Sequence, residues 1–579
     1  MSNALAKSRV EQSRAETPTP GYGHIARRRL TTTAAPQLGV TAVRSEIQPQ
    51  SVPQDPAAAF ANARLFPSSP TTQTLNNGYT HITTLPNGLR VTSENNPGHF
   101  SAIGVYVDAG SRYETDRTSG FAHIMDRLSF KSTHRYSADE MLSKIESLGG
   151  SIMCSSSREC IMYQAAVFPS DLHEAVELLA ETTLRPKFKE EELDMVRMTI
   201  PWELQELETK PEMWLPEIIH EAAYGGRSLG RPLLCPPRQL DVVCTNDLRE
   251  YWRTWYRPER MVVAGIGVEH EEFVKLCTQM GFADLPRSED PVPSLISANI
   301  SKDSGISNID PRPKIYRYNK VSAANPSQFS LATTRAEYHG GKELVAKEGQ
   351  EFTHIHLGFE SAGVDDESRL YTFAALQMLL GGGGSFSAGG PGKGMYSRLY
   401  TRVLNQHAWI ESCLAFHHCY IDTGLLGVSG SCQPKAEHAL LDVMANELEA
   451  LTHGPNSSRL LRSLRRPFRS HSADSTAGLD DEEVARAKNQ LKSNLLMNLE
   501  SRMVQLEDLG RQVQTTGAKV PVETMIEKID SVTIDRLRKA ASELVGRPAT
   551  LVAQGEVGGL ETYADAVLAS HGISIGKRA

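Results

Sequence analysis

The stretch that decides the fold of this chain is residues 120–128, which read Gly-Phe-Ala-His-Ile-Met-Asp-Arg-Leu. Apolar side chains recur within it at the three- and four-residue spacing of a helix that buries one face. The same spacing places His123, Asp126 and Arg127 together on another face. The stretch therefore predicts a short helix that is packed on one side and carries reactive groups on the other.

His123, Asp126 and Arg127 have the spacing of H-x-x-E-H, in which two histidines one helical turn apart bind zinc. In that pattern the Glu is the general base toward the metal-bound water, and a distal carboxylate completes the protein ligands. Here Asp126 stands at the base position and Arg127 at the second ligand position. Arginine stays protonated and offers only donors, so it cannot ligate zinc, and Asp is one methylene shorter than Glu. We therefore expect a degenerate site with no metal of its own and no catalytic residues.

Strands and helices alternate around this helix in the first half of the chain. Asn87-Gly88 between two apolar runs predicts a hairpin, and Ser137 followed by Glu140 predicts a capping box. Pro201 lies inside a long helical pattern, which tolerates it only with a kink or an offset start. The predicted strands are 82–85, 89–92, 102–107, 152–157 and 161–167, and the further predicted helices are 138–148, 172–184 and 190–207.

A second unit with the same succession of elements follows residues 286–350, whose Pro, Ser, Asn and Gly predict an interdomain linker. Its predicted strands are 353–359, 409–417 and 424–431, and its predicted helices are 369–380, 396–405, 436–451 and 481–512. The repeated order predicts an α+β fold of two similar α/β-roll domains that face each other across a cleft. The predicted organisation is a terminal segment 1–75, a domain 76–285, the linker, and a domain 351–570 with an insertion at 455–480.

Composition excludes several classes of protein. Lys and Arg number 61 against 69 Asp and Glu, so the global charge favours no nucleic-acid partner. The longest strongly apolar stretch, 261–268, is far shorter than the roughly 20 residues that span a bilayer, so no transmembrane segment is expected. The eight cysteines form no C-x-x-C pair, which favours reduced, mostly buried thiols.

Two segments are biased in composition. Residues 1–75 are rich in Ser, Thr, Pro, Ala and Gln and are expected to be disordered or cleaved. Their first 50 residues carry an excess of Lys and Arg, which resembles a mitochondrial transit peptide, although an ordinary flexible N-terminus is the alternative. The Arg- and Ser-rich insertion 455–480 is either a solvated loop or a docking tail for an acidic partner.

A glycine-rich run begins at residue 381, between two predicted helices. So many glycines leave the backbone without a preferred conformation, which favours a mobile lid over a passive linker. A phosphate-binding loop is disfavoured because Lys393 is followed by Gly394 and a helix precedes the run. The candidate substrate-binding residues of the run are Gly381, Gly382, Gly383, Gly384, Ser385, Phe386, Gly389, Gly390, Gly392, Lys393 and Gly394.

Acidic residues near this run add two more candidates. Glu360 ends a predicted strand, and Asp366 belongs to an acidic cluster that follows Gly363. Both carboxylates could pair with arginines of a basic peptide. The cluster could equally cap the N-terminus of the next helix, and the sequence leaves both readings open.

Several segments together carry a resemblance to a known family. Residues 85–91, 107–114, 120–128 and 256–263 resemble the pitrilysin and insulinase family of inverted-zincin peptidases. The glycine-rich run is similar to the loop of a non-catalytic subunit in that family, which pairs with a zinc-bearing beta-type subunit. The resemblance covers about residues 80–560.

The resemblance assigns positions to the degenerate site. His123 matches the first zinc ligand, Asp126 the catalytic Glu, Arg127 the second His and Glu203 the distal Glu. Without a cation, Asp126 and Glu203 would repel each other, and Arg127 would supply the missing positive charge. The alternative is that Arg127 extends into solvent and His123 is an ordinary helix histidine.

The resemblance also implies a function. It implies a chain of the mitochondrial matrix that forms a heterodimer with the catalytic subunit and binds basic presequences of precursor proteins without cutting them. The zinc would belong to that partner, and this chain would need no cofactor. The alternatives are a structural core subunit of the respiratory cytochrome bc complex and an active zinc peptidase.

Overall fold

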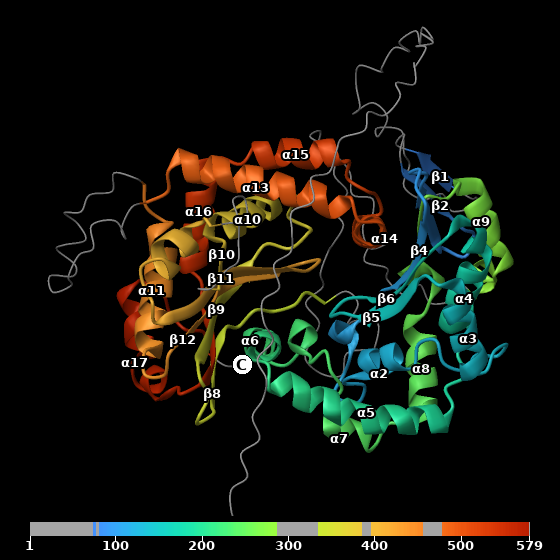
Figure 1. The fold of residues 1–579 in the computed structure, drawn as a ribbon, viewed down its shortest axis with the longest axis horizontal. Helices are drawn as coiled ribbons and strands as arrows, with labels where there is room; N and C mark the ends of the chain where they lie inside the picture. Colours follow the sequence, from blue (N-terminus) through green and yellow to red (C-terminus); the bar gives the residue numbers. More distant parts are fainter. Residues whose placement is uncertain (1–72, 77–79, 287–333, 385–394, 455–477, 578–579) are drawn as a thin grey trace, which may run out of the picture. The chain divides into compact units, whose positions relative to one another are not determined.

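The computed structural model in Figure 1 describes residues 73–76, 80–286, 334–384, 395–454 and 478–577. Within these ranges the chain forms two mixed β-sheets, each covered by helices. The predicted α+β class is confirmed. The predicted insertion lies outside the described residues except at its end.

The first sheet has seven strands in the order β1-β2-β3-β7-β4-β6-β5. Only its β3–β7 pair is parallel among the described strands. Its strands are β1 Gln73–Asn76, β2 Thr80–Thr84, β3 Arg90–Glu94, β4 Ser101–Val107, β5 Ser151–Ser156, β6 Ile161–Val167 and β7 Met261–Ile266. The β2–β3 hairpin closes through the predicted Asn87-Gly88 turn, where Gly88 donates to the carbonyl of Leu85.

The helices of the first half are α2 Phe121–Arg127, α3 Ala138–Leu148, α4 Leu172–Leu184, α5 Glu190–Glu208, α6 Pro211–Tyr224, α7 Pro237–Leu240, α8 Thr245–Trp255 and α9 His270–Gln279. Helix α3 begins at the predicted capping box of Ser137 and Glu140. Helix α5 continues through Pro201. The interior strand β4 is buried on both faces, so its sequence is continuously small or apolar instead of alternating.

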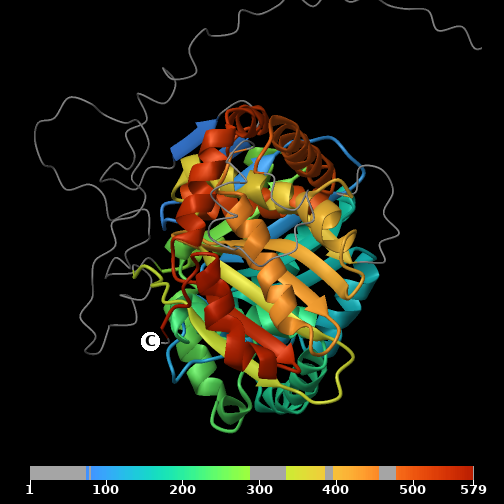
Figure 2. The same ribbon diagram turned by 90° about the vertical axis from the view of Figure 1, so that its left-hand side faces the viewer.

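The second sheet has six strands in the order β10-β11-β12-β9-β13-β8. Its strands are β8 Gly341–Ala346, β9 Thr353–Ser361, β10 Gly382–Gly384, β11 Ile410–Cys419, β12 Gly424–Cys432 and β13 Thr550–Gly555. Its helices are α10 Glu367–Leu380, α11 Glu437–Ala450, α13 Asp481–Leu499, α14 Arg502–Thr516, α15 Val522–Asp530, α16 Ile534–Val545 and α17 Gly558–Ser570. Figure 2 shows α11 in orange and α17 in red lying side by side over this sheet.

Each half of the chain contributes one helix that packs on the sheet of the other half. Helix α14, from the second half, packs on the first sheet, where Leu506 and Leu509 contact the face that presents Tyr106. Helix α6, from the first half, packs on the second sheet, where Leu215 and Ile219 lie in one apolar cluster with residues of β12 and β13. Each sheet therefore has one face closed by the opposite half of the chain.

Four predicted elements differ from the structure. The single helix expected at 481–512 is two helices, α13 and α14, because α14 must turn to reach the first sheet. The helix expected at 396–405 includes a short π-helical segment at Tyr400–Leu404. Residues 341–346, expected in the linker, form β8, and residues 73–75, expected in the disordered or cleaved segment, belong to β1. Both segments are ordered because each completes the edge of a sheet.

A buried ionic cluster joins the halves. Arg112 donates to Asp422 at 2.7 Å and to Glu159 at 2.7 Å, and Arg511 also contacts Glu159 at 3.4 Å. Asp422 further accepts from the amide of Ala336 at 2.8 Å. Burial raises the pKa of Glu159 although the two guanidinium groups oppose that rise. We describe this set, Arg112, Glu159, Asp422 and Arg511, as the ionic cluster.

No helix among the described residues combines the length and the hydropathy that a bilayer crossing needs.

Candidate functional site

The degenerate motif lies on α2, and the start of that helix is built by a carboxylate. Gly120 has φ of +82°, a left-handed conformation that glycine adopts without strain. Oxygens of Glu114 accept from the amides of Gly120 at 2.7 Å and Ala122 at 2.8 Å, groups that have no partner inside the helix. Burial raises the pKa of Glu114 to about 8, and these amide bonds oppose the rise.

The structure brings together all four residues of the predicted site. The Nε of Arg127 lies 3.0 Å from Oε1 of Glu203, and its Nη1 lies 3.5 Å from Oδ1 of Asp126. The Nε2 of His123 lies 3.2 Å from Oε2 of Glu203. Arg127 is therefore paired with both carboxylates, while 42% of its side chain remains exposed.

His123 is a neutral, oriented side chain. Its Nδ1 accepts from the amide of Cys235 at 3.2 Å, so the proton of the neutral ring sits on Nε2. Burial, and then the nearby charge of Arg127, lower the pKa of His123 to about 4. At neutral pH the contact with Glu203 is therefore not an ion pair between two charges.

Asp126 is engaged with the backbone of the first sheet. Its Oδ2 accepts from the amide of Ser156, at the end of β5, at 2.8 Å. Burial raises the pKa of Asp126, while Arg127 and the Ser156 bonds lower it. The carboxylate that stands at the general-base position thus acts as a structural acceptor between α2 and β5.

These residues do not fit a zinc ion. The second ligand position presents a guanidinium, which has donors and no lone pair. The Nε2 of His123 carries the proton that a metal would have to replace. The distal carboxylate, Glu203, is already paired with a permanent cation. No hydrolytic step through a metal is derived for this chain.

Three residues that support the site were not identified from the sequence. Glu114 caps α2, Cys235 orients His123, and Ser156 holds Asp126. Glu114 lies inside a segment that carries the family resemblance, which was a usable signal. Cys235 and Ser156 act through their backbone amides. Every residue except proline has such an amide, so the residue type does not indicate this role.

The beginning of the glycine-rich run is part of a sheet. Gly382–Gly384 form β10 at the edge of the second sheet and pair with β11. Gly381 has φ of +54° and donates to the carbonyl of Gln377, so it ends α10. The helix end and the pairing with β11 therefore anchor these four glycines, and the middle of the run, for which a mobile lid is predicted, lies outside the described residues. Ser385, Phe386, Gly389, Gly390, Gly392, Lys393 and Gly394 lie outside the described residues.

Glu360 and Asp366 line one pocket of about 420 Å³ together with Asp365. Arg547 and the Thr423 hydroxyl donate to Glu360, so this carboxylate already has a cationic partner. Asp366 accepts from the amide of Arg369 at 3.2 Å, which is the helix-capping role that the sequence left open. Burial raises the pKa of Asp365 to about 6.

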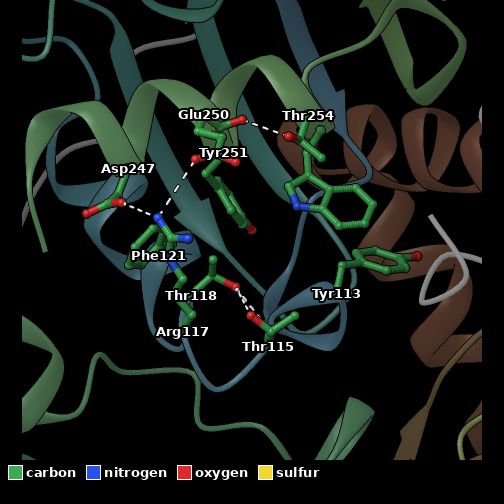
Figure 3. Close-up of a pocket in the computed structure, with 10 residues that line it drawn as sticks. Tyr113, Thr115, Arg117, Thr118, Phe121, Asp247, Glu250, Tyr251 and Thr254 are labelled. Atoms are coloured by element: carbon green, nitrogen blue, oxygen red, sulfur yellow. Dashed lines mark hydrogen bonds and ion pairs between the residues drawn. The ribbon is translucent and has the colours of Figure 1, made fainter. Parts of the chain in front are cut away.

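A second pocket lies beside the start of α2 and is shown in Figure 3. Arg117, which contacts Asp247 at 2.9 Å, lines it together with Phe121 and Tyr251. Its volume of about 50 Å³ holds water but not a peptide side chain such as arginine. We assign it no binding role.

Comparison with known proteins identifies the class. Residues 90–237 match the family Insulinase (Peptidase family M16), and residues 245–466 match the Peptidase M16 inactive domain. The chain belongs to the insulinase family of peptidases, M16. The two domains therefore share the architecture of that family.

Relatives within the family are more specific. The chain is 46% identical to the mitochondrial-processing peptidase subunit alpha of Neurospora crassa, over 82% of this chain and 84% of that protein. It is 41% identical to the probable alpha subunit of Schizosaccharomyces pombe, over 80% and 81%. It is 36% identical to the alpha subunit of Homo sapiens, over 84% and 83%.

A solved structure shares the fold. A chain of complex III2 from Candida albicans, in an Inz-5-bound state, superposes with a TM-score of 0.62, covering 85% of this chain and 99% of that chain. The sequence identity is 17%, so this likeness concerns the fold alone.

Proposed function

We propose that the chain is the non-catalytic, substrate-binding subunit of a heterodimeric peptidase that removes N-terminal presequences from imported mitochondrial precursor proteins. One observation carries the proposal: Arg127 occupies the second ligand position and is paired with Glu203 and Asp126. A chain with this site cannot supply the metal-bound water, so the zinc and the catalytic residues would belong to the partner. This chain then needs no cofactor.

The relatives support the partner and the compartment. All three compared proteins are named alpha subunits of a mitochondrial-processing peptidase, and such a name implies a beta subunit. The basic excess in residues 1–50 agrees with a mitochondrial location. We place the function in the matrix, where presequences arrive.

For the substrate we propose basic presequence peptides. The carboxylates of Glu360, Asp365 and Asp366 lie around one pocket, which would favour an arginine side chain. An arginine would compete with Arg547 for Glu360. The glycine-rich run beyond β10 would contact the peptide backbone, because missing side chains allow two main chains to approach closely.

Deletion of residues 385–392 tests the role of the run and leaves β10 in place. We expect weaker binding of a presequence peptide with subunit pairing and the thermal midpoint nearly unchanged, because the segment carries few apolar side chains to bury. If the intact and shortened heterodimers bind the peptide with equal affinity, the run is only a spacer and does not contact the substrate.

The function itself is tested by purifying the chain alone and with its copurifying partner. We expect far less than one zinc per chain in the isolated protein, a zinc-bearing partner, and cleavage of a presequence peptide only by the pair. About one tightly held zinc in the isolated chain, with chelator-sensitive cleavage, would reject the proposal. Copurification with haem-containing chains would support the alternative of a structural core subunit of the respiratory cytochrome bc complex. A chain of complex III2 shares this fold.

A further inference from the structure

Helix α5 exposes three large apolar side chains on one face. Met195 is 51% exposed, Met198 is 66% exposed and Trp202 is 72% exposed. Their spacing of three and four residues places them in one line along the helix. We call these three residues the α5 stripe. Contiguous exposed apolar side chains of this size mark interaction sites on soluble proteins.

Acidic residues continue the line at both ends. Glu191 lies four residues before Met195, and Glu206 lies four residues after Trp202, so both fall on the same side of α5. Glu206 contacts the exposed Lys210 at 2.6 Å, so an arginine of a ligand would compete with that lysine. From Glu191 to Glu206 the helix rises about 22 Å. Helix α5 carries seven Asp and Glu residues and a single basic residue, Arg197, which is itself paired with Glu190 and Asp194.

The opposite side of α5 is held firmly. Leu193, Val196 and Ile200 are buried in the core of the first half. Glu203 is tied to Arg127, as described above. The stripe therefore sits on a rigid helix, and a ligand that binds there does not have to order the helix first.

We propose that the α5 stripe binds the apolar face of a basic amphipathic helix, with the flanking carboxylates pairing with arginines of that helix. The inference rests on the proposed function and gives the substrate class a location. Mitochondrial targeting peptides are amphipathic, rich in arginine and poor in acids, which complements both features of α5.

The residue types suit a substrate of variable sequence. Methionine is unbranched and polarisable, so two methionines can adapt to different apolar side chains. Promiscuous binding surfaces are often rich in methionine for this reason. An anionic membrane or a nucleic acid would instead be repelled by the charge of α5.

The test uses the complete heterodimer and a synthetic peptide of about 20 residues that is arginine-rich, acid-free and amphipathic as a helix. A scrambled peptide of equal composition has no apolar face. The triple variant Met195→Gln/Met198→Gln/Trp202→Gln removes the apolar surface with good helix formers. The matched control is Leu496→Gln/Met497→Gln/Val504→Gln, which changes three exposed apolar side chains on α13 and α14.

Binding is measured by fluorescence anisotropy at matched ionic strength. We expect the α5 triple variant to bind the amphipathic peptide about tenfold or more weakly, with the control variant unchanged. The scrambled peptide should bind all three proteins equally. Glu191→Gln/Glu206→Gln should flatten the salt dependence of amphipathic-peptide binding. A benzophenone on the apolar face of the peptide should crosslink to α5.

Three results would overturn the inference. Unchanged affinity of the α5 triple variant, or crosslinks confined to other elements, would place the peptide elsewhere. Loss of the partner subunit from the triple variant in gel filtration would make the stripe a subunit interface. Failure of the unaltered heterodimer to bind either peptide would instead reject the proposed function, so the two failures are distinguishable.

Discussion

Arg127 places a permanent positive charge between the carboxylates of Asp126 and Glu203. At that position a zinc ion would need a ligand atom with an available lone pair, and a guanidinium has none. The four residues of the site nevertheless lie together, and the Nε2 of His123 is 3.2 Å from an oxygen of Glu203. The side chain of Arg127 is therefore sufficient to prevent zinc binding, although the four residues still lie close together.

This geometry predicts that zinc binding can be restored. The variant Asp126→Glu/Arg127→His should bind zinc measurably, because the two ring positions lie one turn apart on α2 and face Glu203. Competition with a chromophoric chelator measures the affinity.

The control adds Glu203→Gln to that double variant. Loss of the distal carboxylate should weaken zinc binding at least about tenfold. A folded double variant that takes up no zinc would show that Glu203 is not in position to ligate a metal.

At the scale of elements, the exchange of α6 and α14 depends on close helix–sheet contact. Gly510 of α14 lies against the ring of Tyr106 on β4, and a Cβ at that position would overlap the ring. Tyr106 cannot easily move, because it is buried and its hydroxyl accepts from Gln164 at 2.9 Å. Glycine is needed at position 510 so that α14 can lie close to the sheet, although the backbone of α14 is an ordinary helix.

Gly510→Ala should therefore lower the free energy of unfolding by about 1–3 kcal/mol, the usual range for overpacking. Gly558→Ala is the matched control, since a Cβ there meets nothing within 4 Å. Thermal and denaturant unfolding measure both. Equal stability of the two variants would show that α14 can shift away from the sheet.

Helix α6 brings a histidine cluster into its contact with the second sheet. His220 of α6 lies with its ring 4.9 Å from that of His418 on β11, and the Tyr420 hydroxyl donates to its Nε2 at 2.7 Å. Burial lowers the pKa of His220 well below 6.5, that of His418 to about 4 and that of His356, on β9, to about 3. All three rings are neutral at neutral pH.

Acid should therefore destabilise the protein through this cluster. The unfolded chain takes up protons near pH 6.5 while the folded rings do not, so stability falls as pH decreases from about 6.5 toward about 4. The free energy of unfolding is measured against pH for His418→Gln and for the exposed control His173→Gln. Only His418→Gln should reduce the dependence of the unfolding free energy on pH. An unchanged dependence would contradict the attribution of the acid sensitivity to this histidine cluster.

At the scale of the whole molecule, the ionic cluster connects distant parts of the described chain. Asp422 receives hydrogen bonds from Arg112, 310 residues away in sequence, and from the amide of Ala336. All of these groups are buried, so each charge depends on its partner for solvation.

Asp422→Asn should lower the free energy of unfolding by about 3–5 kcal/mol, because it leaves the Arg112 charge with one carboxylate fewer in the interior. Asp565→Asn removes an exposed ion pair with Lys342 of similar length and should change stability by less than about 1 kcal/mol. Calorimetry measures the thermal midpoint and the stability of both variants. Similar thermal midpoints would mean that the cluster adds nothing to the contact between the halves.

Features that depend on local chemistry could be predicted from the amino-acid sequence. The helical face of His123, Asp126 and Arg127, the capping box of α3 and the hairpin turn at Asn87-Gly88 follow from residue spacing and backbone preference within a few positions. The inability of Arg127 to bind zinc is a property of the side chain itself.

Tertiary structure decided everything that requires a partner distant in the chain. The break between α13 and α14 has neither Gly nor Pro to mark it, and it exists because α14 must reach the opposite sheet. For Glu360 and Asp366 the sequence left substrate binding and helix capping open, and only the fold shows that Glu360 pairs with Arg547 and that Asp366 caps the start of α10. The supports of His123 and Asp126 are backbone amides, and their positions exist only once the chain has folded.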